Sequence, residues 1–87
     1  MKFFRSRIVI VEDNEAIREG FSLIINSISK FVVINAYDNC EDTIKNLKKD
    51  RPEIILMDLE LPGMNGISGI YEIKKRMPGI EVIVNSK

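Results

Sequence analysis

The sequence has no histidine, and that absence removes several kinds of chemistry at once. Without an imidazole, the 87 residues can hold no Ser-His or Cys-His catalytic pair, no imidazole metal ligand and no phosphohistidine of their own. The single cysteine, Cys40, excludes an internal disulfide and a zinc site built from several cysteines. Any metal ion bound by this chain must therefore be held by oxygen atoms.

An excess of charge of either sign is also absent, because 13 Lys and Arg residues balance 13 Asp and Glu residues. Nucleic-acid binders and proteins that bind anionic membranes carry a positive excess, so we expect neither as a direct partner. No apolar run approaches the roughly 20 residues that a membrane-spanning helix needs. Arg5 and Arg7 interrupt the apolar start of the chain, which argues against a signal peptide. These features predict a cytoplasmic protein.

The sequence does contain a recurring alternation of strand-like and helix-like segments. Four short apolar runs, rich in β-branched residues, are typical of parallel strands that helices cover on both faces. Between them, apolar residues recur at helical spacing and form one stripe per segment. With right-handed crossovers, this order predicts an α/β fold with a doubly wound parallel sheet. The runs cover residues 8–11, 31–34, 54–57 and 80–84; the stripes are Ile17, Phe21, Ile24 and Ile28, then Cys40, Ile44 and Leu47, then Ile67, Ile70, Ile73 and Met77.

Residues at the expected helix ends agree with these boundaries. Asp and Asn are preferred caps at helix N-termini because their side chains accept hydrogen bonds from free backbone amides. Cys40 lies on the inner stripe of the second helix, so we expect a small core residue and not a reactive thiol. The basic run over residues 74–76 lies near a helix C-terminus, where it favours the helix dipole, and we expect it to be solvated. The candidate caps are Asp13 or Asn14, Asp38 or Asn39, and Asn65, in chain order.

Acidic residues follow the predicted strands at the sheet edge where sites form. In an open parallel sheet, ligands bind outside the carboxyl ends of the strands. Glu12 and Asp13 follow the first strand, Asp58 follows the third, and Ser86 comes shortly after the fourth. Neighbouring parallel strands lie about 4.8 Å apart, so these carboxylates would repel one another unless a cation lay between them. Mg²⁺, which takes oxygen ligands and keeps several waters, suits such a site.

Some of these residues also have a structural interpretation. For Asp13 the sequence does not choose between capping a helix and binding a metal. Asp58 stands where a charged side chain facing other acids has little structural purpose. Ser86 alone indicates little, since serine is common at strand ends.

Two stretches of the sequence resemble the receiver domain of bacterial two-component response regulators. They are residues 7–14, Arg-Ile-Val-Ile-Val-Glu-Asp-Asn, and residues 54–66, Ile-Ile-Leu-Met-Asp-Leu-Glu-Leu-Pro-Gly-Met-Asn-Gly. The resemblance covers the chain in register and implies a flavodoxin-like sheet with strand order 2-1-3-4. It also implies one domain over residues 1–87 that lacks the helix, strand and helix with which the family's domain ends. The family's fifth-strand lysine would be missing with them, and Lys87 is not that lysine.

The resemblance also implies roles for individual residues. Glu12 and Asp13 resemble the metal-binding acid pair, and Asp58 resembles the aspartate that accepts a phosphoryl group from a histidine kinase. Glu60 would offer its backbone carbonyl to Mg²⁺, and Ser86 matches the switch hydroxyl that bonds to the phosphoryl group. The implied function is a Mg²⁺-dependent phosphoacceptor in two-component signal transduction, connected to an output domain or protein. Such a domain is not an enzyme beyond its own phosphorylation and dephosphorylation.

Competing functions follow from the same residues. The favoured reading is a phosphoacceptor weakened by the missing elements; the alternative is a receiver that serves only as a protein-interaction or dimerisation module. Without a fifth strand, residues 81–84 would form an unpaired apolar edge, and we expect a homodimer through this edge. A third reading, a small nucleotide-binding enzyme, has little support because residues 12–15 are acidic where a phosphate-binding turn needs Gly and amide donors.

Overall fold

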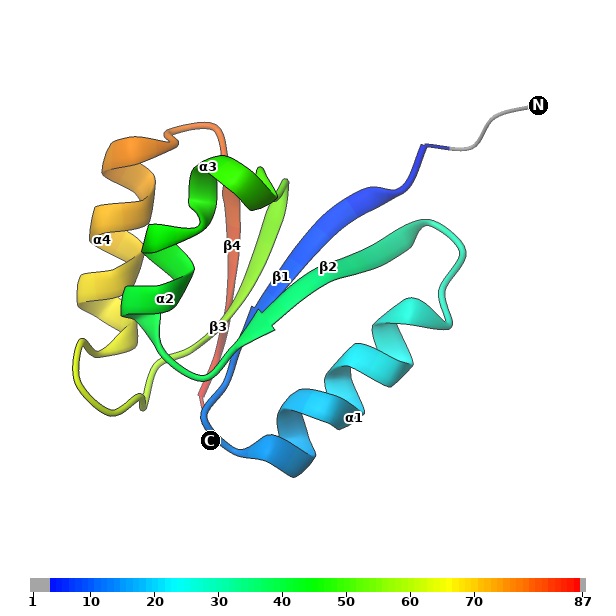
Figure 1. Cartoon of the computed structure of the whole chain (residues 1–87), viewed down its shortest axis with the longest axis horizontal. Coiled ribbons are helices and arrows are strands. Elements are labelled where there is room, and N and C mark those ends of the chain that lie inside the picture. Colours follow the sequence, from blue (N-terminus) through cyan, green and yellow to red (C-terminus); the bar gives the residue numbers. More distant parts are fainter. Residues whose placement is uncertain (1–3, 87) are drawn as a thin grey trace.

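A four-stranded parallel sheet with helices on both faces forms the centre of the molecule (Figure 1), and the computed structural model describes residues 4–86. The strand order is β2-β1-β3-β4, and all three pairings are parallel. Both the α/β fold class and the strand order expected from the sequence are therefore confirmed. The elements are β1 (Ser6–Val11), α1 (Glu15–Asn26), β2 (Phe31–Tyr37), α2 (Cys40–Lys45), α3 (Leu47–Asp50), β3 (Ile54–Asp58), α4 (Gly66–Arg76) and β4 (Glu81–Asn85).

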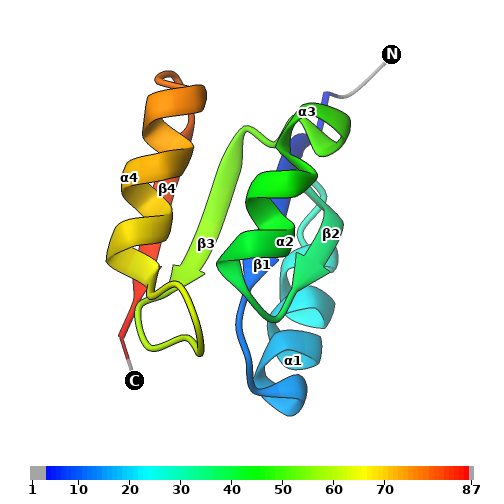
Figure 2. The same cartoon turned by 60° about the vertical axis from the view of Figure 1, so that its left-hand side comes forward.

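Alternation along the strands sorts the core onto the two faces of the sheet. Val9 and Val11 belong to the main core cluster, which they share with residues of α2, α3 and α4. Ile8, which precedes Val9 and points to the opposite face, lines a small apolar trough with Ile25 of α1 and Ile28 just after α1. Because successive strand residues point to opposite faces, α1 lies on one face and the other three helices lie on the other (Figure 2).

Coverage of the sheet is uneven, which corrects the expectation of full coverage for β2 and agrees with the exposed edge expected at β4. Residues 8–11 of β1 are buried, but β2 is half-buried throughout, and Ile83 and Val84 of β4 are each 48% exposed. Ile83 and Val84 are exposed because α1, the only described helix on its face, packs on β2 and β1, and β2 is an edge strand that pairs only with β1. Two members of its predicted inner stripe, Ile24 and Ile28, are accordingly 62% and 42% exposed.

The second predicted helix is divided in two, which the apolar stripe did not indicate. The break falls at Asn46, whose side-chain amide donates to the carbonyl of Asp42 at 2.8 Å and so competes with the helical backbone bonds. After α3 the chain turns through Arg51, a non-glycine residue with φ of 47°. The guanidinium of Arg7 donates to the carbonyls of Asp50 and Arg51 and holds this turn against β1.

Asparagine caps each of the three longer helical segments. In the first two, the choice between Asp and Asn is settled in favour of Asn14 and Asn39, and Asn65 caps α4 as predicted. Each side chain satisfies an amide that the helix leaves free. The bonds are Ile17 N to Asn14 Oδ1 at 3.0 Å, Asp42 N to Asn39 Oδ1 at 2.7 Å and Ser68 N to Asn65 Oδ1 at 2.9 Å.

The basic run at the end of α4 is exposed, as expected for Lys74, Lys75 and Arg76. The ammonium group of Lys74 also donates to the carbonyl of Ile80 and ties the helix end to the start of β4. Among residues 4–86, no helix is both long enough and apolar enough to cross a membrane.

Two glycines provide a test of how tightly the helices pack. A Cβ at Gly69 would lie 2.3 Å from the Sγ of Cys40, whereas a Cβ at Gly20 meets nothing within 4 Å. We expect Gly69→Ala to lower the free energy of unfolding by about 1 to 3 kcal/mol through overpacking. Gly20→Ala, in an open part of α1, should raise it by about 0.5 to 1 kcal/mol. Urea denaturation followed by circular dichroism measures both, and an unchanged midpoint for Gly69→Ala would contradict the close packing of α4 on α2.

Candidate functional site

The carboxyl ends of β1 and β3 lie side by side, and this pairing assembles the candidate site. In the parallel register, Val11 of β1 lies opposite Met57 of β3. The next residues, Glu12 and Asp58, therefore leave the two strands as neighbours. Residues that follow adjacent parallel strands share one edge of the sheet, which is where ligands bind in folds of this class.

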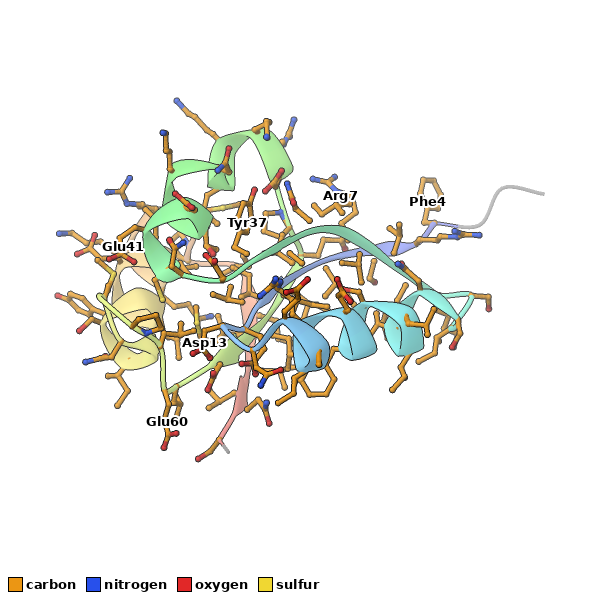
Figure 3. The ribbon with its side chains drawn as sticks, turned by 60° about the horizontal axis from the view of Figure 1, so that its bottom comes forward. Phe4, Arg7, Asp13, Tyr37, Glu41 and Glu60 are labelled. Carbon is orange, nitrogen blue, oxygen red and sulfur yellow. The ribbon has the colours of Figure 1, made fainter. Side chains whose placement is uncertain are left out.

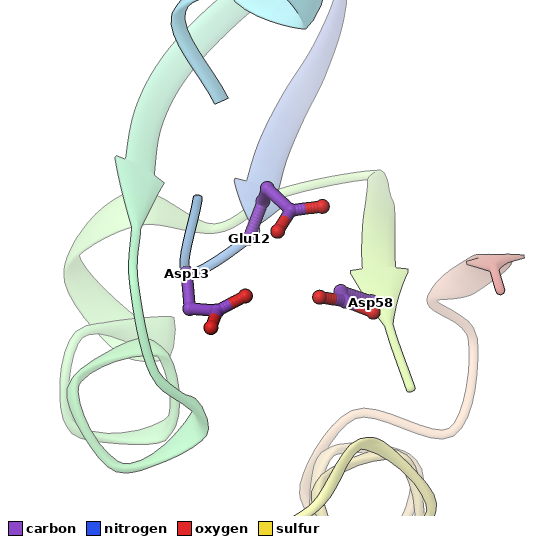
Figure 4. Close-up of side chains that lie close together, drawn as sticks. All are labelled: Glu12, Asp13 and Asp58. Carbon is purple, nitrogen blue, oxygen red and sulfur yellow. The ribbon is translucent and has the colours of Figure 1, made fainter. Parts of the chain in front are cut away.

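Three carboxylates form the centre of this site (Figure 4). Glu12, Asp13 and Asp58 each offer an oxygen atom, and these oxygens all lie within 4.8 Å of one another. The side chains of Glu12 and Asp58 are buried, each only 1% exposed, whereas Asp13 is exposed. Acidic side chains are rarely this buried unless they are paired or bind a metal. The cluster is a recessed group of oxygen ligands with one member that faces solvent.

Hydrogen bonds fix the turn that carries the first two acids. The amide of Asn14 donates to Oε2 of Glu12 at 3.0 Å. The guanidinium of Arg18 donates to the carbonyls of Glu12, at 2.9 Å, and Asp13, at 3.5 Å. Because Asn14 caps α1, Asp13 does not, and its carboxylate faces that of Asp58 (Figure 4). The interpretation of Asp13 as a helix cap is therefore wrong.

The loop after β3 is held close to Asp58 by its own backbone. The amide of Glu60 donates to Oδ1 of Asp58 at 3.0 Å, and the amide of Leu59 donates to the carbonyl of Asn85 at 3.2 Å. The amide of Gly66 returns to the carbonyl of Leu59 at 3.1 Å. A Cβ at Gly66 would lie 2.5 Å from the carbonyl oxygen of Asp58, so only glycine lets α4 begin this close to the site.

Glu41, in the first turn of α2, holds the loop after β3 at a second point, near Met64. Its Oε2 accepts a hydrogen bond from the amide of Met64 at 3.1 Å. The preceding residue, Gly63, has φ of 72°, and a Cβ there would lie 2.7 Å from the same carboxylate oxygen. Neither Glu41 nor Arg18 was predicted from the sequence to support the site. Gly63 in the Pro-Gly turn indicated that another group packs closely against this turn. Nothing in the sequence indicated that this group is the carboxylate of Glu41.

The remaining predicted site residues, Glu60 and Ser86, lie at the same end of the sheet as the acid cluster. Glu60 is exposed and its side chain points away from the sheet (Figure 3), while its amide contacts Asp58. Ser86 is exposed and directly follows Asn85, the residue that pairs with Asp58 across β3 and β4. Ser86 therefore lies at the same sheet edge as the acids. Lys87 falls outside the described residues.

Cys40 and Tyr37, the other potentially reactive side chains near the core, are not activated as nucleophiles. Burial, and secondarily the charge of Glu41, raises the pKa of the Cys40 thiol to about 11. The thiol is fully buried, with its Sγ 3.7 Å from the Sδ of Met57, as expected of a core residue. Burial, followed by a hydrogen bond to Asp50, raises the pKa of Tyr37 well above its usual value. Both groups stay protonated at neutral pH.

The donor set of the cluster fits a hard divalent cation. All three side chains offer oxygen, and within residues 4–86 they are the only three acidic or cysteine side chains gathered closely enough to hold a metal ion. Mg²⁺ is bound in proteins by one or two carboxylates together with waters. The mixture of two buried acids and one exposed acid leaves a solvent side where such waters would lie.

A model of the response regulator receiver domain matches residues 8–87. Among curated proteins, the chain is 37% identical over 78 residues to protein-glutamate methylesterase/protein-glutamine glutaminase 2 of Paramagnetospirillum magneticum, covering 90% of this chain and 22% of that protein. It is 31% identical over 80 residues to the transcriptional regulatory protein DegU of Brevibacillus brevis, covering 92% of this chain and 34% of that protein. The chain thus spans about a third or less of these relatives.

Solved structures show the same fold. The response regulator domain of Thermotoga maritima CheB superposes with a TM-score of 0.88 at 28% identity, over 94% of this chain and 60% of that one. A DNA-binding response regulator of the LuxR family from Staphylococcus aureus superposes with a TM-score of 0.85 at 28% identity, over 93% of this chain and 68% of that one.

The matches and the acid cluster lead to one assignment. The cluster lies at the ends of β1 and β3, and the family model covers β1 from residue 8, all of β3 and the loops that follow both strands. A receiver domain is a phosphoacceptor and not an enzyme, and it implies a cognate histidine kinase. This chain belongs to the response regulator receiver domain family of two-component signalling.

Proposed function

We propose that this chain is a Mg²⁺-dependent phosphoacceptor that takes a phosphoryl group on Asp58 from a histidine kinase. The observation that carries the proposal is the position of Asp58. Its carboxylate is buried at the end of β3, and an oxygen of it lies within 4.8 Å of oxygens of Glu12 and Asp13. A structural role alone would not require three acids in one place, since like charges repel.

Glu12, Asp13 and Asp58, with the backbone carbonyl of Glu60, would hold the cation. When bound, Mg²⁺ supplies positive charge that offsets the repulsion between the Asp58 carboxylate and an incoming phosphoryl group. The protein's part is to hold these oxygens in place through the Asn14 amide and the Arg18 guanidinium described above. Affinity is expected to be weak because Mg²⁺ gives up its waters reluctantly.

The transfer itself needs little more than positioning. An oxygen of the Asp58 carboxylate forms the new O–P bond while the N–P bond of phosphohistidine breaks. The electron pair of that bond returns to the imidazole nitrogen, which takes a proton from solvent. We assign the hydroxyl of Ser86 a hydrogen bond to the phosphoryl group once it is attached, which would draw the end of β4 toward Asp58.

Catalysis of phosphoryl transfer depends on fixed positive charge directed at the phosphoryl oxygens. The acid cluster would supply such charge through the metal ion that it holds.

The proposed role of Asp58 predicts that Asp58→Asn abolishes phosphorylation. Incubation with acetyl phosphate and Mg²⁺, followed by intact-mass measurement, should show the gain of one phosphoryl group in the parent chain and none in the variant. Hydroxylamine should remove the group, because it cleaves acyl phosphates. Asp38→Asn is the matched control, since Asp38 is an exposed acid just after β2 at the same sheet edge, and it should keep the gain. An equal gain in Asp58→Asn would place the chemistry elsewhere.

The proposed metal site predicts that Asp13→Asn weakens Mg²⁺ binding by roughly tenfold, because one charged ligand is lost. Isothermal titration calorimetry, or the Mg²⁺-dependent shift of the amide signals of residues 12–14 and 58–60, measures the affinity. Asp38→Asn removes the same charge outside the cluster and should change the affinity less than about twofold, as expected for a screened surface charge. If the two variants bind Mg²⁺ equally well, the three acids do not form the site.

A second candidate function, a homodimerisation module, is favoured by the exposed side of β4. No described strand pairs with the outer edge of β4, and its Ile83 is 48% exposed. An unpaired strand edge is self-complementary, because two copies can pair antiparallel about a twofold axis. Beside it lies a trough of about 180 Å³ between α1 and the sheet, and its lining is entirely apolar: Ile8, Ile25, Ile28, Phe31, Ile54, Leu56 and Ile83.

The dimer proposal predicts that Ile83→Lys yields a monomer, because a charge on a strand edge opposes pairing. Multi-angle light scattering at low micromolar concentration should give a dimer for the parent chain. Leu23→Lys is the matched control: Leu23 is 76% exposed on α1 and does not line the trough, so this variant should remain a dimer. A stable monomer of the parent chain would refute self-association through β4.

A further inference from the structure

A second recess lies away from the acid cluster, between neighbouring helices on one face of the sheet. This groove, of about 470 Å³, is formed by the end of α2, by α3 and by the end of α4. These elements lead into the starts of β3 and β4, whereas the acids follow the ends of β1 and β3, so the two sites lie at opposite ends of the sheet (Figure 1). The groove is lined by Ile44, Lys45, Leu47, Lys48, Arg51, Arg76 and Met77.

The lining combines an apolar floor with a rim of a single charge. Ile44, Leu47 and Met77 form the floor, and all three pack in or against the main core cluster. The other four lining residues are cations, and no acidic residue lines the groove. The chain as a whole has zero net charge. The four cations around this recess, with no acid among them, therefore form a local concentration of positive charge.

Few acids neutralise this rim. The guanidinium of Arg76 lies 3.8 Å from the carboxylate of Glu72, and among residues 4–86 this is the only ion pair that involves a rim cation. Asp50, the acid next to Arg51 in the chain, is turned away, because its carboxylate accepts a hydrogen bond from the hydroxyl of Tyr37. The rim therefore faces solvent with most of its charge available to a ligand.

Helix dipoles explain only part of this arrangement. Lys45, Lys48 and Arg76 lie in the last turns of α2, α3 and α4, where a cation interacts favourably with the dipole. That effect acts within each helix separately. It does not account for cations from three helices converging on one apolar floor, nor for Arg51, which lies beyond the end of α3.

The turn that presents Arg51 is fixed in place. Arg51 has φ of 47°, and its carbonyl accepts a hydrogen bond from the guanidinium of Arg7 on β1. Leu47, on the floor below, is only 4% exposed. A recess with a buried floor and an anchored backbone turn at its rim loses little backbone entropy when a ligand binds.

We propose that this groove is a docking site for an acidic amphipathic peptide segment of a partner protein. Its apolar side chains would cover the floor, and its carboxylates would meet the cations of the rim. Helix-in-groove recognition of this kind uses apolar anchors at helical spacing with charge complementarity around them. The recessed floor argues against a flat membrane surface, and the absence of aromatic side chains from the lining argues against single-stranded nucleic acid, which stacks on such residues.

The test uses a defined probe, a synthetic helical peptide of about 14 residues with Leu at positions i, i+3, i+4 and i+7 and Glu at most others. Titration into the ¹⁵N-labelled full chain, followed by NMR, should shift the amide signals of residues 44–51 and 76–77 most strongly. The double variant Lys48→Glu with Arg76→Glu should bind about tenfold more weakly, because two attractive pairs become repulsive. A peptide with Ser in place of the Leu residues should lose binding to a similar degree.

The matched control is the double variant Lys49→Glu with Lys75→Glu. It changes the net charge equally, on the same two helices, at residues that do not line the groove. Its affinity for the probe should stay within about twofold of that of the parent chain. Equal weakening in both double variants would show general charge attraction and overturn the proposal. So would the absence of any shift at millimolar probe, or binding to phosphatidylglycerol vesicles but not to the peptide.

Discussion

Repulsion among three carboxylates is the constraint on which the arrangement of this molecule depends. Two unit charges 4 Å apart repel by about 1 kcal/mol in water and by about 4 kcal/mol at the effective dielectric of a protein surface. Oxygens of Glu12, Asp13 and Asp58 all lie within 4.8 Å of one another. The strands that carry them must therefore be held together by interactions stronger than this repulsion. These interactions are the burial of β1, the most completely buried strand, and its pairing with β2 on one side and β3 on the other.

The surrounding contacts limit how the acids could move apart. Arg18 holds the turn after β1 through two backbone carbonyls, and Glu41 holds the loop after β3 through the amide of Met64. Both contacts come from helices, one on each face of the sheet. A cation that enters the cluster would thus find its oxygen ligands already in position. The free energy needed to bring the three acids together is offset by the folding of the whole domain.

Local signals were sufficient to predict the strands, the order of elements and the acid cluster. A buried parallel strand needs a continuous apolar run, so the strands could be recognised in the sequence. A residue directly after such a strand lies at the carboxyl end of the sheet, so the positions of Glu12 and Asp58 could also be predicted. The resemblance to receiver domains added the strand order. Asn14 and Asn39 were each one of two candidates, because Asp and Asn cap helices about equally well.

The features that the sequence did not reveal depend on contacts between distant segments. The contact of Glu41 with the loop at Met64 joins residues 23 positions apart, and no periodicity reports such a pair. The break at Asn46 arises because the side-chain amide of Asn46 competes with the helical backbone bonds. The apolar stripe continues past it to Leu47 and so predicts an unbroken helix.

The close approach of Gly69 to the thiol of Cys40 also restricts how this sequence can vary. Even a methyl group at position 69 would overlap the sulfur, and a larger side chain at position 40 would meet the backbone of α4. The distance between α2 and α4 is thereby set by two of the smaller residue types acting together. Among relatives with the same helix packing, substitutions at these two positions are expected to be correlated, with volume gained at one position matched by volume lost at the other.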